Sequence, residues 1–138
     1  MASNSIKVDF KSGMNFSTNI NGHLLQIDQD ESAGGTDLGP RPKALMLASL
    51  GGCTGFDIVS ILNKMRVTFS NFSINIEGNL SDTEPAIYNK VMLNYIIMVD
   101  EADEPKMEKA VKLSKEKYCG VSKMFESFAE VAFTITYL

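Results

Sequence analysis

The sequence predicts an α+β fold in which largely antiparallel strands are grouped around helices. Two observations carry this prediction. Segments in which apolar and polar residues alternate, as in half-buried strands, occur near both ends of the chain and in its middle. A long segment that is apolar on nearly every side separates the first strands from the later ones, so strands and helices do not alternate as they do in a parallel α/β sheet.

Three strands are expected in the N-terminal part of the chain. Residues 6–10 alternate apolar with polar side chains, and residues 14–16 follow as the second arm of a hairpin. Asn21-Gly22 is a strong turn signal, and a third strand over residues 23–27 follows it. Residues 29–42 then collect turn formers and acidic residues without apolar periodicity, which predicts a loop.

A long helix is expected from Lys43 to about Met65. Pro42 suits the start of a helix, and the basic residues that follow Asn63 suit its end. A helix that is apolar on nearly every side must be buried on nearly every side, which a small domain does not easily provide from its own chain. A partner subunit is therefore expected to cover part of it.

The second half of the chain adds two strands, two helices and a last strand to a single domain of residues 1–138. The order is therefore βββ-α-ββ-α-α-β. These later elements are a strand around residues 72–78, a long strand over 88–99, a helix that begins after the acidic residues 100–104 and is interrupted at 118–120, a short helix to about Phe128, and a strand over 131–137.

Composition excludes several classes of partner. A net charge of −4 and a pI near 5.0 provide no field that attracts nucleic acid or an anionic membrane surface. The N-terminal segment lacks the basic start and apolar core of a secretion signal, and no apolar run was expected to reach the ~20 residues of a membrane span. The sequence predicts a cytoplasmic protein, in which its two cysteines stay reduced rather than form a structural bridge.

The two cysteines, Cys53 and Cys119, are the candidate chemical groups. They lie far apart in the sequence and form no CxxC pair, and His23 is the single histidine, so a metal site is not expected. Cys53 lies inside the long helix, where it is either an inert buried residue or a reactive thiol. Cys119 begins a helix just after Lys115 and Lys117, which favours a thiolate, although a cysteine in that position can also serve packing alone.

The surroundings of Cys53 conflict with helix propensity. The stretch LGGCTGF places three glycines around this cysteine, and each costs roughly 0.5–1 kcal/mol in a helix interior relative to alanine. We expect them to allow a neighbouring helix or a substrate to approach the thiol closely. Asp57 lies one turn beyond Cys53, where a carboxylate disfavours a thiolate, and its simpler role is a hydrogen bond.

The sequence resembles the OsmC/Ohr family of osmotically induced and organic hydroperoxide resistance proteins. The resemblance rests on GPRP at residues 39–42, on ALMLASLGGCTGFDIVSILNKMR at 44–66 and on LSKEKYC at 113–119, and it is closest to the OsmC-like branch. It implies an intertwined homodimer in which antiparallel sheets from both chains wrap two long central helices.

The resemblance also implies a thiol-dependent peroxidase. The cysteine matching Cys53 would attack an organic hydroperoxide and become a sulfenic acid, and the one matching Cys119 would condense with it to a disulfide. An external dithiol reductant would reset the pair, and no metal, flavin or haem is implied.

The sequence departs from the family at the residues that activate the thiolate. Peroxidatic members use an arginine from the N-terminal strand region and a glutamate just after the proline that precedes the central helix. Here Lys43 and Ala44 follow that proline, and no arginine precedes Pro40. Whether Arg41, Lys43 or Arg66 replaces the arginine stays open.

Because of these departures, two further interpretations stand beside the peroxidase. One is a differently specialised dimer that binds a small apolar or thiol-reactive ligand at the same interface. The other is a structural dimer whose cysteines are core residues.

Overall fold

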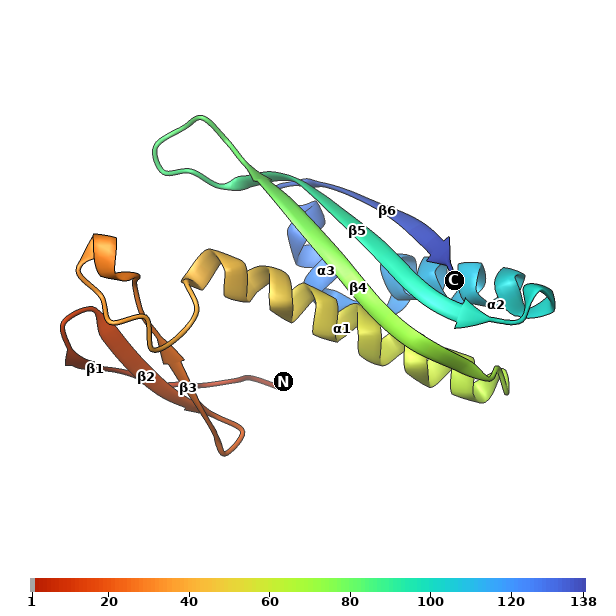
Figure 1. Cartoon of the computed structure of the whole chain (residues 1–138), viewed down its shortest axis with the longest axis horizontal. Coiled ribbons are helices and arrows are strands. Elements are labelled where there is room, and N and C mark those ends of the chain that lie inside the picture. The colour runs from red at the N-terminus through yellow and green to blue at the C-terminus, as the bar shows by residue number, and fades with distance from the viewer. Residues whose placement is uncertain (1) are drawn as a thin grey trace. The chain divides into compact units, whose positions relative to one another are not determined.

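A computed structural model describes residues 2–138 as a mixed α+β protein with two sheets (Figure 1), in the element order that the sequence predicts. The chain forms two compact units, one up to Met46 and one from Leu47 to Leu138. The elements are β1 (Val8–Ser12), β2 (Asn15–Ile20), β3 (His23–Ile27), η1 (Glu31–Ala33), α1 (Pro42–Lys64), β4 (Phe69–Leu80), β5 (Tyr88–Val99), η2 (Glu101–Asp103), α2 (Glu104–Leu113), η3 (Ser114–Tyr118), α3 (Gly120–Glu126) and β6 (Glu130–Tyr137).

The first unit is an antiparallel sheet with its strands in sequence order, β1-β2-β3. Between β2 and β3, Asn21 and Gly22 both have a positive φ, 52° and 83°. Two such residues in a two-residue loop form the tight hairpin turn that matches the twist of the flanking strands. The turn predicted from these two residues is therefore confirmed.

This N-terminal sheet has no apolar core of its own. Among residues 2–46, the buried side chains are all polar, namely those of Asn15, Thr18 and Asp28. The side chains of Phe10 and Leu24, by contrast, are 59% and 67% exposed. A small sheet needs an apolar face packed against something to be stable in water. The apolar residues of this unit thus require a surface that the unit itself does not supply.

A buried carboxylate organises the loop after β3. Asp28 is 2% exposed, and its carboxylate accepts hydrogen bonds from the Gln29 amide, the Leu38 amide and the Thr36 hydroxyl at 2.8–3.2 Å. Burial acts to raise the pKa of Asp28, but the bonds from Leu38, Gln29 and Thr36 outweigh it and hold this pKa below its ordinary value of 3.8.

We expect Asp28→Asn to be less stable than the wild type at neutral pH, and the difference to disappear in acid. A carboxylate whose pKa is lowered by folding stabilises the folded state above the unfolded-state pKa, and this contribution is lost as the pH falls through the folded-state pKa. Urea unfolding midpoints of both proteins, measured from pH 7 to below pH 3.8, check this. A gap that is independent of pH would contradict the assignment.

The second unit is built on a three-stranded sheet with β5 in the centre. β4 pairs with β5 in antiparallel register, as predicted, whereas β6 pairs with β5 in parallel, from Lys90 opposite Glu130 to Ile97 opposite Tyr137. The pairing is thus largely antiparallel, as predicted, and β6 is the exception. The reason is the connection: α2, η3 and α3 carry the chain back along the sheet, so the last strand enters in the direction of β5.

The core of the second unit lies between one face of this sheet and the helices. Alternate residues of β5 point into it, including Leu93, Tyr95 and Ile97, which are at most 3% exposed. α1 contributes the stripe Leu50, Thr54, Ile58, Leu62, and α2 and α3 contribute Met107, Ala110, Val111 and Phe125.

α1 is buried along a single stripe rather than on nearly every side. The elements of the second unit leave its opposite side uncovered, and the Phe56 ring there is 80% exposed. By length and composition alone this helix could cross a bilayer, with a mean hydropathy of 1.7 over its most apolar window, so the expectation that no apolar run reaches that length is wrong. A core helix of a soluble protein meets the same description.

The helix after β5 is interrupted just before Cys119, as predicted. α2 passes into one π-helical turn, Ser114–Tyr118, and the Cys119 amide donates to the Ser114 carbonyl at 2.8 Å. Cys119 is extended and forms the N-cap of α3. Single π-helical turns are frequent at functional sites. This one turns the side chain of Ser114 and that of Cys119 into the core beneath α1.

Candidate active site

The fold brings the two cysteines together with one carboxylate. The sulfurs of Cys53 and Cys119 and a carboxylate oxygen of Asp57 all lie within 4.8 Å of one another. Cys53 and Asp57 are one turn apart on α1, and Cys119 reaches them from the start of α3. Both cysteines are reduced. The sequence names all three residues, but only the tertiary fold shows that they form one site.

The two thiols differ in exposure. Cys53 is half-buried, whereas Cys119 is 3% exposed and packs in the core cluster. Of the interpretations left open for Cys53, a fully buried and inert thiol does not fit this position. A dissolved oxidant reaches Cys53 before it reaches Cys119.

Cys119 is held as a neutral thiol. Burial, followed by its hydrogen bond with Cys53, raises the pKa of Cys119 to about 12, and the negative field of Asp57 adds to this. The Ser122 amide donates to its sulfur at 3.3 Å and lowers the pKa, but by less. The expectation that the helix start and neighbouring lysines favour a thiolate here is therefore wrong, because desolvation dominates.

The two lysines named in that expectation have other partners. Lys115 donates to the Val131 carbonyl at 2.9 Å and lies over the Phe133 ring. Lys117 lies over the ring of Tyr118. Their ammonium groups are thus engaged by β6 and by a neighbouring ring.

We expect an alkylating reagent at pH 8 to modify Cys53 well before Cys119. With a pKa of about 12, only about one Cys119 in ten thousand is a thiolate at that pH, and the thiolate is the nucleophile. Peptide mass mapping of the reduced protein after timed exposure to iodoacetamide measures both rates. Denatured protein, in which both thiols are exposed, is the control, and equal rates in the folded protein would contradict the asymmetry.

A chain of buried hydroxyl groups ends on the Asp57 carboxylate. Tyr95 on β5 bonds Thr54 on α1 at 2.8 Å, Thr54 bonds Ser114 at 2.8 Å, and Ser114 bonds Asp57 at 3.0 Å. Burial raises the pKa of Tyr95 to about 12, so its hydroxyl keeps its proton.

The direction of this chain follows from the number of protons. Each hydroxyl has a single proton to donate, and an ionised carboxylate can only accept. Ser114 gives its proton to Asp57, so it accepts from Thr54, which in turn accepts from Tyr95. All three dipoles point the same way and fix the carboxylate beside the two sulfurs.

The sequence did not indicate that Thr54, Tyr95 and Ser114 belong to the site. In the structure each is a buried hydroxyl-bearing residue on its own element. Buried polar groups must find partners. Three such groups on elements that share one core therefore point to a shared network.

The glycines around Cys53 have different roles. A Cβ on Gly51 would come within 2.7 Å of the Ile76 side chain, so this glycine lets β4 pack closely on α1. A Cβ on Gly55 would make ordinary contact with Ile74, and one on Gly52 would meet nothing within 4 Å. The close neighbour is thus a strand, not a helix, and Gly52 faces open space; approach of a substrate stays a prediction.

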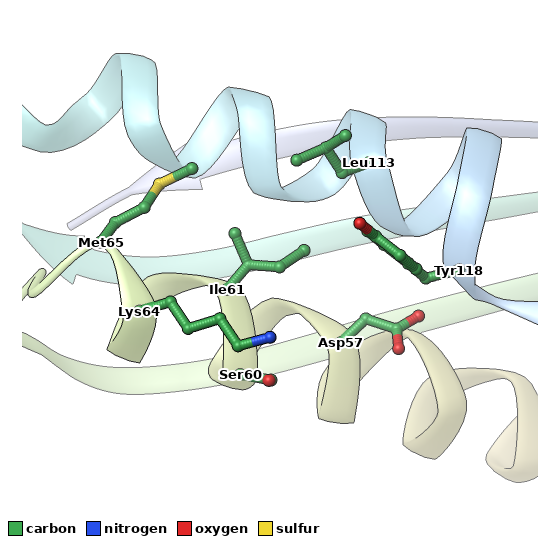
Figure 2. A pocket seen from close by; sticks show the side chains of 7 residues that line it. All are labelled: Asp57, Ser60, Ile61, Lys64, Met65, Leu113 and Tyr118. Carbon is green, nitrogen blue, oxygen red and sulfur yellow. The ribbon is translucent and has the colours of Figure 1, made fainter.

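A cavity of about 350 Å³ adjoins the site. Figure 2 shows Asp57 and Tyr118 at one end of it and Lys64 and Met65 at the other. Ile61 and Leu113 supply apolar wall between the two ends. Asp57 belongs both to the wall of this cavity and to the thiol cluster, and it thus connects the two.

The remaining basic candidates are placed as follows. Arg41 donates to the Asp37 carboxylate at 2.6 Å and to the Gly39 carbonyl, both in the loop of the first unit. Lys43, Arg66 and His23 are exposed. Among the polar groups close to the two thiols are the Asp57 carboxylate, which hydroxyl groups hold in place, and the Ser122 amide.

Comparison with known proteins assigns the chain to a family. The model of the family described as OsmC-like protein matches residues 34–134, which include the thiol pair and Asp57. The chain belongs to the OsmC-like family. This membership confirms the family that the sequence motifs indicate.

Individual OsmC-like relatives cover nearly the whole chain. Protein YhfA of Escherichia coli K12 is 29% identical over 126 residues, 91% of each chain. A hypothetical protein from Aquifex aeolicus VF5 has a crystal structure that matches with a TM-score of 0.82 at 25% identity, over 100% of this chain and 99% of that one. A Legionella pneumophila structure named as an organic hydroperoxide resistance protein OsmC matches with a TM-score of 0.67 at 17% identity, over 99% of each chain, and this shows a shared fold.

Proposed function

We propose that this protein is a thiol-dependent peroxidase that reduces organic hydroperoxides through Cys53 and Cys119. The observation that carries the proposal is the pairing of a half-buried thiol with a buried one, their sulfurs within 4.8 Å of each other. Membership in the OsmC-like family and the name of the Legionella relative support it.

The reaction balances in three steps. Cys53 loses its proton to solvent and attacks the terminal oxygen of the hydroperoxide as a thiolate. The O–O bond breaks, and the products are a Cys53 sulfenic acid and an alkoxide, which takes a proton from solvent and leaves as the alcohol. The sulfur of Cys119 then displaces hydroxide from the sulfenic acid, which leaves as water, and a disulfide forms. A dithiol reductant returns both cysteines to thiols and is itself oxidised to a disulfide. Turnover needs no metal, flavin or haem.

Asp57 has a defined task in the second step. Cys119 is a neutral thiol because burial raises its pKa to about 12, so its proton must leave as its sulfur attacks. The Asp57 carboxylate lies within 4.8 Å of both sulfurs and can accept this proton and pass it to the departing hydroxide. Ser114 holds the carboxylate in place for this transfer.

The adjoining cavity suits the organic part of a hydroperoxide. Its wall is apolar along Ile61, Leu113 and Met65, and it ends at Asp57 beside the thiols. An alkyl chain bound there would lie against Asp57, whose carboxylate is within 4.8 Å of both sulfurs. The free energy of binding would come from the apolar surface that is removed from water.

A second copy of the chain completes the molecule in this proposal. The N-terminal sheet lacks an apolar core among residues 2–46, and one side of α1, around Gly52 and Phe56, is uncovered. A homodimer whose subunits exchange these surfaces would bury both. The proposed dithiol reductant implies a reducing compartment, and we propose a cytoplasmic location on that ground.

One observation favours a second function, binding of a small apolar or thiol-reactive ligand without turnover. The sequence lacks the matching arginine and glutamate of peroxidatic relatives, and the carboxylate that lies close to both thiols is that of Asp57. Such a site would capture an electrophile on Cys53 but reduce peroxides slowly.

Consumption of an organic hydroperoxide by the reduced protein with a dithiol present separates the two functions. The peroxidase predicts many turnovers per chain, and, without the dithiol, one hydroperoxide consumed per chain with a disulfide between Cys53 and Cys119. The ligand-binding function predicts no turnover and two thiols that remain titratable after exposure to the hydroperoxide.

A further inference from the structure

The thiol pair and Asp57 also have the composition and spacing of a metal site. In a tetrahedral zinc site the thiolate and carboxylate ligands lie 2.0–2.3 Å from the ion, so that ligand atoms are separated by roughly 3.5–4 Å. The three ligand atoms here lie within 4.8 Å of one another, so small side-chain rotations bring them onto an ion. The sequence did not indicate this site, because Cys119 lies far from Cys53 in the sequence and reaches α1 only in the folded chain.

Neighbouring groups hold the ligands in the way that metal sites require. The Ser114 hydroxyl donates to Asp57 Oδ2 at 3.0 Å, and the chain through Thr54 and Tyr95 supports it. A carboxylate has about four lone-pair positions, of which this bond uses one. The Ser122 amide donates to the sulfur of Cys119. Hydrogen bonds of this kind orient the ligands and raise metal affinity.

We propose that the reduced protein binds one Zn²⁺ through Cys53, Cys119 and Asp57, with a fourth position left for water, and that the bound ion blocks thiol chemistry. On binding, two thiol protons leave to solvent and two metal–sulfur bonds form, with no electron transfer. Thiolate ligands select zinc over magnesium and calcium, which prefer oxygen. The disulfide form lacks both thiolates and does not bind.

The ion is a reversible inhibitor rather than a cofactor of turnover. While Zn²⁺ occupies the site, neither sulfur is free to attack a peroxide or an electrophile. The site therefore responds both to the metal and to the oxidation state of the cysteines. The inhibitory part of this inference rests on the proposed function, whereas the binding part does not.

Cobalt serves as the probe because tetrahedral Co²⁺ absorbs in the visible range and thiolate ligation adds a charge-transfer band. Reduced full-length protein, freed of reductant under nitrogen, is titrated with Co²⁺ and then with Zn²⁺. We expect both absorptions to saturate at one Co²⁺ per chain and to vanish as Zn²⁺ displaces it. Competition with a chromophoric chelator gives the affinity for Zn²⁺.

Variants assign the ligands. Cys53→Ser and Cys119→Ser should each weaken Zn²⁺ binding at least 100-fold. Asp57→Asn should weaken it at least tenfold while the charge-transfer band persists, and Ser114→Ala should weaken it about tenfold through loss of orientation. Asp82→Asn, an exposed carboxylate in the loop between β4 and β5, is the matched control and should bind like the wild type.

Three results would overturn the site. The first is the absence of a charge-transfer band with Co²⁺, and the second is an affinity for Zn²⁺ in the disulfide form equal to that of the reduced wild type. The third is wild-type affinity for Zn²⁺ in both cysteine variants, which indicates adventitious binding. The disulfide form guards against variants that fail to fold. In the peroxide assay, one equivalent of Zn²⁺ should stop turnover and a chelator should restore it. A protein that binds Co²⁺ but never reduces peroxide contradicts the peroxidase and leaves the metal site standing.

Discussion

Cys53→Ser should reduce hydroperoxide consumption to the uncatalysed background, because Cys53 is the thiol of the pair that solvent reaches. Cys119 remains in this variant, but it is 3% exposed and its pKa is raised to about 12, so it does not replace the lost nucleophile. The measurement is hydroperoxide loss with a dithiol present, at equal concentrations of variant and wild type. Activity equal to that of the wild type would contradict the mechanism.

Cys119→Ser is the matched variant, and it should fail at a different step. The first attack needs only Cys53, so one hydroperoxide per chain is consumed and a sulfenic acid then accumulates. A dione reagent that traps sulfenic acids, followed by mass spectrometry, should label Cys53 in this variant and not in the wild type, where the disulfide forms first. Labelling of both proteins to the same extent would remove the resolving role of Cys119.

Thr54→Val should destabilise the protein by about 2–3 kcal/mol, although valine has nearly the shape of threonine. Thr54 is 2% exposed and its hydroxyl joins Tyr95 to Ser114. Without it, the buried Tyr95 hydroxyl loses its acceptor and Ser114 loses its donor, and each buried unsatisfied group costs about 1–3 kcal/mol. The measurement is the free energy of unfolding from urea titration.

The direction of the hydroxyl chain predicts a smaller effect for Tyr95→Phe, about 1 kcal/mol. This change removes the first donor of the chain and leaves the bonds from Thr54 to Ser114 and from Ser114 to Asp57 in place. Thr68→Val, at an exposed threonine, is the control and should lie within about 0.5 kcal/mol of the wild type. A larger loss for Tyr95→Phe than for Thr54→Val would reverse the assigned direction.

Local patterns predicted most of the secondary structure because each depends on neighbouring residues. The alternation along Tyr88–Val99 and the Asn21-Gly22 turn reappear in the structure at the predicted positions. The interruption before Cys119 was also predicted, and it is a π-helical turn. Strand pairing depends on the path of the connecting helices instead, so the parallel pairing of β6 with β5 did not follow from the sequence of either strand.

The ionisation state of Cys119 shows why local reasoning failed at the site. Its sequence neighbours, a helix start and two lysines, favour a thiolate. In the folded chain the lysines contact Val131, Phe133 and Tyr118, and the sulfur is enclosed by core residues. Burial of a charge outweighs a distant cation because the low-dielectric interior replaces water around the whole group.

By itself the sequence determined the α+β class, the order of the elements and the OsmC-like family, and it named the two candidate cysteines. These follow from periodicity, turn residues and short motifs, each of which lies within one contiguous segment of the chain. Only the tertiary structure decided that Cys53, Cys119 and Asp57 share one site, that Thr54, Ser114 and Tyr95 orient it, and that one thiol is open while the other is buried. Distance, burial and desolvation depend on which distant segments meet, and that is settled by packing rather than by any one stretch of residues.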